Sequence, residues 1–177
     1  EALELRQAKI GTPLLILGYT DAEMAPLLAR RQITQTVTGL EHAGALNRAA
    51  KKAGVRLRVH IKVDTGMARL GLDCRSEAQI RRSAAEIRAI MALENLYVEG
   101  IFTHFAVADT PSSDFTKAQF AHFKQLLALL EKEQIYIPIR HCCNSAAILR
   151  ESEMHLDMVR MGIILYGLSP DHDGMDD

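Results

Sequence analysis

The chain of 177 residues carries 21 basic and 22 acidic side chains, which gives a formal net charge of −1. This near-neutral balance argues against a nucleic-acid-binding surface or a polybasic membrane patch, because both need clustered basic charge. Hydrophobic residues make up 48% of the sequence and charged residues 24%, and these globular values exclude wholesale disorder. We therefore expect a folded protein that does not bind nucleic acid.

The cysteines and the N-terminus indicate a protein of a reducing compartment. Cys74, Cys142 and Cys143 cannot close a disulfide framework and none lies in a C-x-x-C pair, so we expect reduced thiols and no metal site. The segment Glu1–Ala8 carries acidic residues and no apolar core, unlike a signal peptide. No window has the apolar length that spans a bilayer. We expect a soluble, cytoplasmic chain.

Strand and helix patterns alternate along the chain. Six short apolar runs predict strands, at Leu14–Leu17, Ile33–Val37, Val59–Val63, Val98–Thr103, Ile135–Arg140 and Met158–Leu165. Between them, Thr20–Glu23 and Ser76–Gln79 have the form of helix capping boxes. Residues 116–133 place apolar side chains at helical spacing, which predicts one buried stripe. This order predicts a parallel sheet whose right-handed crossovers place helices on its outside.

Two closures of such a sheet compete, an open doubly wound sheet and a (β/α)8 barrel. The doubly wound fold needs a glycine-rich phosphate loop after its first strand, and Gly18–Asp21 contains no G-x-G-x-x-G. We therefore predict an α/β fold of the (β/α)8 TIM-type barrel, with about six β/α units present. A complete barrel usually needs about 250 residues. We expect residues 1–170 to be a partial barrel that lacks its first strands, and 171–177 to be a linker.

Chemistry-bearing side chains collect first on the strand Val59–Asp64. Aliphatic and ionisable residues alternate along it, so His60, Lys62 and Asp64 share one face. In a barrel this face points inward, where a lysine is costly unless it is paired or chemically altered. Arg69 follows in the next loop and has the natural chemistry of a carboxylate clamp. An edge strand with Lys62 in solvent fits the spacing equally well.

Three further strands end on polar residues. His104, His141 and Arg160 each follow an apolar run, and ligands of such barrels bind at the carboxyl ends of the strands. One histidine after a strand is usually a core or loop residue. Several such residues from separate strands together predict a functional site.

A phosphate site is predicted after the last two strands. Asn144 and Ser145 open a short helix whose first backbone N–H groups are free to bind an anion. Gly162 interrupts the last run beside Ile163, where the backbone can approach a ligand closely. The alternative is an ordinary N-cap serine together with a bulge glycine.

Four stretches with the order and spacing of one family carry a resemblance. The segments His60–Gly71, Gly100–Ala106, His141–Ala147 and Asp157–Pro170 closely resemble bacterial alanine racemase. That family is a pyridoxal 5'-phosphate enzyme with an N-terminal (β/α)8 barrel and a C-terminal β domain, and it works as a head-to-tail homodimer. The resemblance implies alanine as the substrate, D-alanine for peptidoglycan in the cell wall as the product, and residues 171–177 as a linker toward a C-terminal β domain.

The resemblance also implies roles for single residues. Lys62 resembles a lysine that becomes carbamylated and then holds Arg69, which orients the substrate carboxylate and the cofactor's phenolic oxygen. Arg160 resembles the arginine that hydrogen-bonds the pyridine nitrogen and keeps it unprotonated, which favours α-proton exchange. His104 and His141 resemble members of the hydrogen-bond chain from that arginine to the catalytic tyrosine of the partner subunit. The phosphate cradle of the family corresponds to Asn144, Ser145, Gly162 and Ile163.

The departures from the family pattern concern the two bases and one loop residue. The family's cofactor-binding lysine lies in a Lys-Ala-Asn-Ala-Tyr-Gly-His type motif, whereas Lys9 lies in a helical run and Lys51 and Lys52 in Ala-Ala-Lys-Lys-Ala-Gly. The tyrosine base belongs to the C-terminal domain. The resemblance therefore implies two-base racemisation by the complete protein and an inactive chain when this part is alone. Ala68 stands where glycine is common, and we expect little effect unless the position needs a positive φ.

Two other functions remain open on the sequence. The same scaffold can act on serine or on several amino acids, because the absent domain builds most of the side-chain pocket. A non-catalytic carrier of pyridoxal 5'-phosphate with a related barrel is the third possibility. The segment Lys62–Arg69 and Arg160 disfavour the carrier, because these residues serve racemase chemistry rather than storage.

Overall fold

The computed structural model describes residues 1–110 and 114–170. The strands there are β1 (Leu14–Ile16), β2 (Ile33–Val37), β3 (Leu57–Asp64), β4 (Leu72–Asp73), β5 (Leu96–Phe102) and β6 (Ile139–His141). All pairs are parallel, and the order β1-β2-β3-β5-β6 follows the chain, with β4 paired to β3. An order without reversal is that of a barrel wall rather than of a doubly wound sheet.

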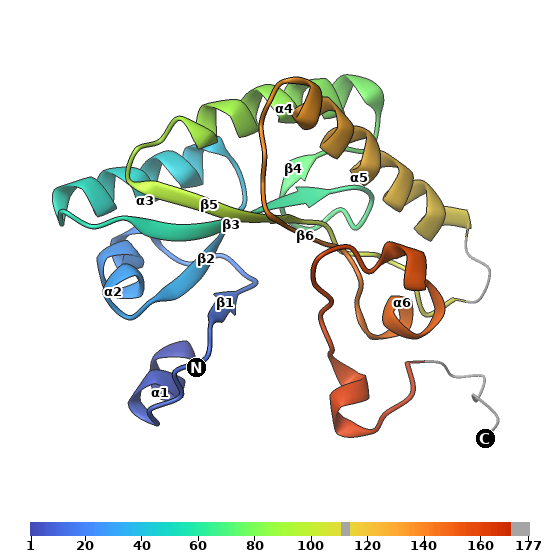
Figure 1. Ribbon diagram of the computed structural model, residues 1–177, viewed down its shortest axis with the longest axis horizontal. Coiled ribbons are helices and arrows are strands. Elements are labelled where there is room, and N and C mark those ends of the chain that lie inside the picture. The colour runs from blue at the N-terminus through green and yellow to red at the C-terminus, as the bar shows by residue number, and fades with distance from the viewer. Residues whose placement is uncertain (111–113, 171–177) are drawn as a thin grey trace.

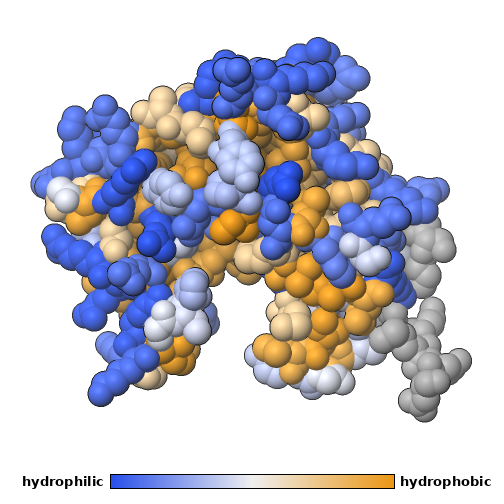
Figure 2. Space-filling view, viewed as in Figure 1, coloured by the Kyte–Doolittle hydropathy of each residue, from blue (hydrophilic) through white to orange (hydrophobic). Residues whose placement is uncertain are grey.

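Helices flank the strands of this sheet along the described chain. They are α1 (Ala2–Gln7), α2 (Ala25–Arg30), α3 (Leu40–Lys52), α4 (Glu77–Met91), α5 (Asp114–Lys132) and α6 (Ser145–Arg150), with 3-10 turns η1 (Ala22–Met24), η2 (Ser152–Met154) and η3 (Ile163–Tyr166). Figure 1 shows α3, α4 and α5 along the convex side of the sheet. Figure 2 shows a hollow on the other side, between the arm that carries α1 and the arm that carries α6. The predicted α/β architecture with parallel strands is confirmed.

The alternation of side chains in β3 decides which side of the sheet is the core. Val59, Ile61 and Val63 are fully buried in the apolar cluster to which the helices contribute. Burying an aliphatic side chain of this kind stabilises the fold by about 1.5–3 kcal/mol. His60 and Lys62 therefore point to the opposite side. The edge-strand alternative is wrong, because β3 lies between β2 and β5 and Lys62 is only 2% exposed.

The predicted strand over Met158–Leu165 is wrong. Its pairing is limited to one bridge, between Met158 and His141, and the chain then turns into η3. The Gly162 N–H donates to the Oγ of Ser145 at 2.9 Å instead of to a neighbouring strand. The apolar run therefore leaves the sheet at this glycine, although its composition is typical of a strand.

Other element boundaries follow local chemistry. The strand predicted from Ile135 begins only at Ile139, because Pro138 has no N–H to donate to the sheet. The capping box at Ser76 is confirmed, since its Oγ accepts the N–H of Gln79 at 3.4 Å. The box predicted over Thr20–Glu23 is wrong, because the element there is the three-residue 3-10 turn η1 without a side-chain cap.

The loop between β3 and β4 is held by one carboxylate. The Oδ1 of Asp64 accepts the N–H groups of Gly66 (2.9 Å) and Ala68 (3.1 Å). This turn places Ala68 at a φ of 56°, and Gly66 and Gly71 also have positive φ. Position 68 therefore needs the left-handed conformation that costs an L-residue with a Cβ about 1–2 kcal/mol.

Cys74, Cys142 and Cys143 are free and buried. No helix within residues 1–110 and 114–170 is long and apolar enough to cross a bilayer. The linker predicted over 171–177 lies outside the described residues.

Replacing Ala68 by glycine tests the conformational cost of this loop. We expect Ala68→Gly to raise the free energy of unfolding by about 1 kcal/mol, because the relief of left-handed strain exceeds the added entropy of the unfolded chain. Urea denaturation measures the change. The matched control is Ala92→Gly, at a φ of −80°, which should destabilise the protein. A loss of stability in Ala68→Gly would show that the backbone at Ala68 is not strained.

Candidate active site

The guanidinium of Arg160 is the centre of a polar cluster at the carboxyl ends of β5 and β6. Its Nη1 donates to the Nδ1 of His141 at 2.6 Å, and its Nη2 donates to the carbonyl oxygens of Thr103 (2.9 Å) and Cys142 (3.0 Å). Nη2 also lies 3.3 Å from the Nδ1 of His104. Because arginine only donates, the Nδ1 atom of each histidine is an acceptor and carries no proton.

Two N–H groups of Arg160, the Nε–H and one of the two on Nη1, are directed to no group of the described residues. The carbonyl and histidine contacts fix the plane of the guanidinium, so these donors are held in fixed directions. The arrangement can therefore bind an acceptor atom of a ligand.

The histidines of this cluster are held in the neutral form. Burial and the neighbouring charge of Arg160 lower the pKa of His141 to about 2 and that of His104 to about 4. Burial also lowers the pKa of His60 to about 4, although the carboxylate of Glu99 opposes this shift. At neutral pH the three imidazoles therefore accept or donate hydrogen bonds without carrying charge.

Lys62 contributes a buried amine to the site. Its Nζ is buried without a hydrogen-bond partner among residues 1–110 and 114–170, and it lies 5.0 Å from the centroid of the Phe102 ring. Burial, together with repulsion from Arg160 and Arg69, lowers its pKa to about 8, and Asp64 opposes this shift. A buried amine without a partner costs about 1–3 kcal/mol or more, so this position is suited to a modification or a ligand that supplies the missing contact.

The residues predicted for phosphate binding lie together, but with roles that differ in detail. Asn144 is the N-cap of α6, and its side chain accepts the N–H of Ala147 at 3.2 Å. Ser145 is the first helical residue, and its Oγ accepts the N–H of Gly162. A Cβ at Gly162 would lie 3.2 Å from this Oγ, which is tighter than most such contacts. Ile163 follows as the first residue of η3 and is 45% exposed.

Arg69 is the predicted site residue that stands apart from the cluster. It is exposed on the loop after β3, where it lines a shallow pocket with Thr38, Asp64 and Gly71. Its charge still contributes to the lowered pKa of Lys62 and of His104. Arg69 therefore lies on an exposed loop, near enough for its charge to act on Lys62 and His104.

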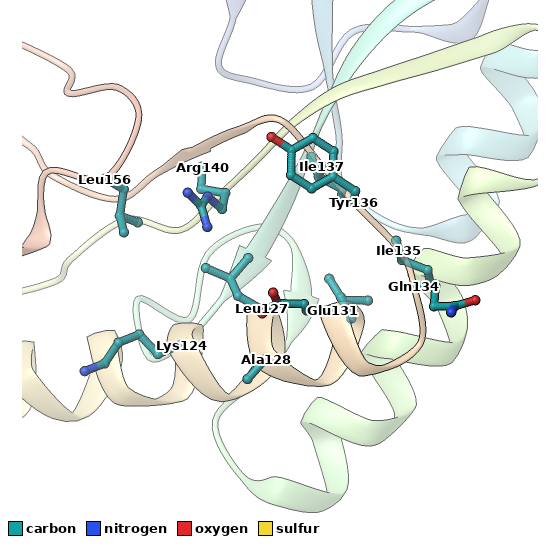
Figure 3. Close-up of a pocket in the computed structure, with 11 residues that line it drawn as sticks. Lys124, Leu127, Ala128, Glu131, Gln134, Ile135, Tyr136, Ile137, Arg140 and Leu156 are labelled. Carbon is teal, nitrogen blue, oxygen red and sulfur yellow. The ribbon is translucent and has the colours of Figure 1, made fainter.

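A second pocket lies on another part of the molecule. Figure 3 shows it between α5 and the segment that leads into β6, with Leu127, Tyr136, Arg140 and Leu156 among its lining residues. None of the residues predicted for catalysis or cofactor binding lines this pocket. The polar residues of the Arg160 cluster therefore lie outside this pocket.

The comparison with known proteins decides the family. A family model described as "Alanine racemase, N-terminal domain" matches residues 1–170. The chain belongs to the alanine racemase family. It is 47% identical to "Alanine racemase" from Desulfovibrio desulfuricans and 48% identical to that from Methanococcus maripaludis, each over 170 residues that cover 96% of this chain and 44% of the relative. The chain spans less than half the length of the curated relatives it matches.

Solved alanine racemases give the same fold. The enzyme of Clostridium difficile 630 in complex with cycloserine is 40% identical with a TM-score of 0.90, over 98% of this chain and 46% of that one. The enzyme of Bacillus anthracis with bound L-Ala-P is 29% identical with a TM-score of 0.87, over 97% and 43%. The parallel sheet of this alanine racemase family chain is thus part of a (β/α)8 barrel, as predicted.

The neutral histidines predict a stability that falls in acid. Between pH 6.5 and about 4 the unfolded chain binds protons on His60, His104 and His141 that the folded state excludes, so the free energy of unfolding decreases as the pH falls. Each histidine contributes a slope of about 1.4 kcal/mol per pH unit. Urea denaturation at a series of pH values measures this slope. His60→Gln should reduce the slope by about 1.4 kcal/mol per pH unit, which is the contribution of one proton. An unchanged slope would refute the neutral form assigned to His60.

Proposed function

We propose that this chain forms the cofactor-binding barrel of a pyridoxal-phosphate-dependent racemase that interconverts L- and D-alanine. The observation that carries the proposal is the cluster in which Arg160 is fixed by two neutral histidines, with the buried Lys62, which has no hydrogen-bond partner in the described part of the chain, nearby. When bound, pyridoxal 5'-phosphate supplies an electron sink that acidifies the α-hydrogen of an amino acid. The residues of the chain bind and orient the reacting groups.

Arg160 is suited to hold the ring nitrogen of the cofactor. Burial lowers its pKa only to about 10, so the guanidinium stays charged and its Nε–H remains a donor. A donor that cannot give up its proton leaves an acceptor nitrogen unprotonated. The electron sink is then weaker, which favours the exchange of a proton over transamination.

We assign the phosphate group of the cofactor to two neighbouring pieces of chain, Asn144 with Ser145 and Gly162 with Ile163. Ser145 Oγ and the Gly162 backbone already meet there, and a side chain at Gly162 would crowd this space. Backbone N–H groups and a hydroxyl are common phosphate donors. In the same way, we assign Arg69 to bind and orient the substrate carboxylate and the phenolic oxygen of the cofactor.

Racemisation needs one base on each face of the α-carbon, so that one removes a proton and the other returns one. His104 and His141 are assigned here to the hydrogen-bond chain that orients the base on one face. Apart from Lys62, the lysines of this chain are exposed: Lys9, Lys51, Lys52, Lys117, Lys124 and Lys132. We therefore propose that the bases come from outside residues 1–177 and that this chain has no turnover by itself. A cytoplasmic homodimer, completed by the C-terminal domain of the partner subunit, supplies them.

We propose that the amine of Lys62 is modified to a carbamate. With a pKa near 8, a substantial fraction of the amine is unprotonated at neutral pH and can add carbon dioxide. The neutral amine forms a bond to the carbon of carbon dioxide and releases a proton to solvent, so that a buried cation is replaced by an anion that attracts Arg69. The addition therefore removes the repulsion that lowers the pKa of Lys62 and turns Arg69 toward the site.

Kinetics of the complete enzyme test the function. We expect racemisation of L-alanine, and a loss of kcat/KM by roughly a hundredfold in Arg69→Ala, because the charge pair that orients the substrate carboxylate is lost. Arg75→Ala is the matched control, since Arg75 lines the same pocket but pairs with Asp73. Retained activity in Arg69→Ala would contradict its role. A higher kcat/KM for serine than for alanine would reassign the substrate.

Labelled bicarbonate tests the carbamate. We expect a ¹³C carbamate signal in the wild-type protein that grows as the pH rises through about 8, because more Lys62 becomes unprotonated. The signal should be absent in Lys62→Gln and present in Lys124→Ala, which removes an exposed lysine. A signal that persists without Lys62 would refute this site.

A further inference from the structure

The pairing of β3 with β5 contains an irregularity beside the Arg160 cluster. Val59 pairs with Val98, but the next residue, His60, pairs with Gly100, so Glu99 is skipped. Such a bulge places one extra residue in a strand and redirects the side chains that follow it. Val98 and Ile101 therefore both pack in the core cluster, whereas strict alternation would place them on opposite faces.

The bulge creates room and a partner for His60. Gly100 faces the imidazole directly, and a Cβ at this position would overlap the ring. Glu99 is directed to the same side, where its Oε1 lies 3.6 Å from the Nε2 of His60 and accepts the hydroxyl of Thr34 at 2.7 Å. Glycine and glutamate together thus hold the ring of His60 in one position.

His60 connects this carboxylate to the arginine. Its Nδ1 lies 2.9 Å from the Nε2 of His141, and the Nδ1 of His141 accepts from Arg160 at 2.6 Å. Arg160 at one end only donates, and the carboxylate of Glu99 at the other end only accepts. Because both imidazoles are neutral, one arrangement satisfies every contact: His141 donates from Nε2 to His60, and His60 presents its Nε2–H to Glu99.

The opposite arrangement is unfavourable for the arginine. If His60 carried its proton on Nδ1, His141 would accept at Nε2 and carry its own proton on Nδ1. That N–H would then face the N–H of Arg160, and the short contact between them would be lost. An unpaired buried donor of this kind costs about 1–3 kcal/mol.

We propose that Glu99 is a positioning residue for Arg160. By fixing the tautomers of His60 and His141, it fixes the direction in which the guanidinium presents its Nε–H. The proposal rests on the proposed function only for the reaction it supports, since the tautomers are a property of the chain itself. Glu99 does not touch the reacting groups and acts through the two histidines.

The test compares Glu99→Gln with Glu99→Asp and with the control Glu94→Gln, which removes an exposed carboxylate from the loop before β5. Glutamine keeps the shape of glutamate, but its amide can donate as well as accept. NMR of the complete protein, with ¹⁵N- and ¹³C-labelled histidine, reads the tautomers of His60 and His141 without the reaction. Racemisation of alanine gives kcat and KM.

We expect both histidines to carry the proton on Nε2 in the wild-type, Glu99→Asp and Glu94→Gln proteins. In Glu99→Gln a second population with the proton on Nδ1 should appear, and kcat should fall by roughly tenfold while KM changes little. If tautomers and kcat are unchanged in Glu99→Gln, the proposal is wrong. If the tautomers shift but the wild-type protein does not racemise alanine, the proposed function fails and the positioning role stands. A lower melting temperature with unchanged tautomers and kcat would make Glu99 only structural and overturn the proposal.

Discussion

The charge of Arg160 constrains every polar group around it. A guanidinium held against the ends of β5 and β6 must use its donors, and it uses them on two backbone carbonyls and two imidazoles. Since it cannot accept, both histidines must present an unprotonated Nδ1. The same charge adds to burial in lowering the pKa of each imidazole, so the neutral form that the hydrogen bonds need is also the form that the electrostatics favour.

Much of this site follows from the alternation of side chains along β3. The pattern places His60, Lys62 and Asp64 on one face of the strand, and three apolar runs end on His104, His141 and Arg160. The fold bears this out, because β3 lies in the middle of the sheet and Val59, Ile61 and Val63 fill the core. Period-two alternation is reliable where one face of a strand is fully buried.

The parts that sequence patterns miss depend on single residues. The run Met158–Leu165 has the composition of a strand, yet one hydrogen bond from Gly162 to Ser145 takes it out of the sheet. His60 was placed on the inner face of its strand but given no role, and Glu99 was not predicted at all, because a bulge in β5 changes the face of later side chains without changing the composition. An isolated glycine in a strand is a signal for such a bulge, and Gly100 carries it. The positive φ of Ala68 could not be predicted from the residue type, because the hydrogen bonds that Asp64 accepts in this loop impose it.

The balance of charge explains what kind of ligand the inner face is suited to bind. Lys62, Arg69 and Arg160 lie close enough to influence one another, and their repulsion contributes to the lowered pKa of Lys62. The nearby carboxylates are already engaged, because Asp64 holds the loop after β3 and Glu99 holds Thr34. The site therefore has an excess of positive charge that no group of the described chain neutralises. Anions with fixed geometry, such as a phosphate, a substrate carboxylate or a carbamate on Lys62, would relieve this repulsion, and each would orient a different cation as it does so.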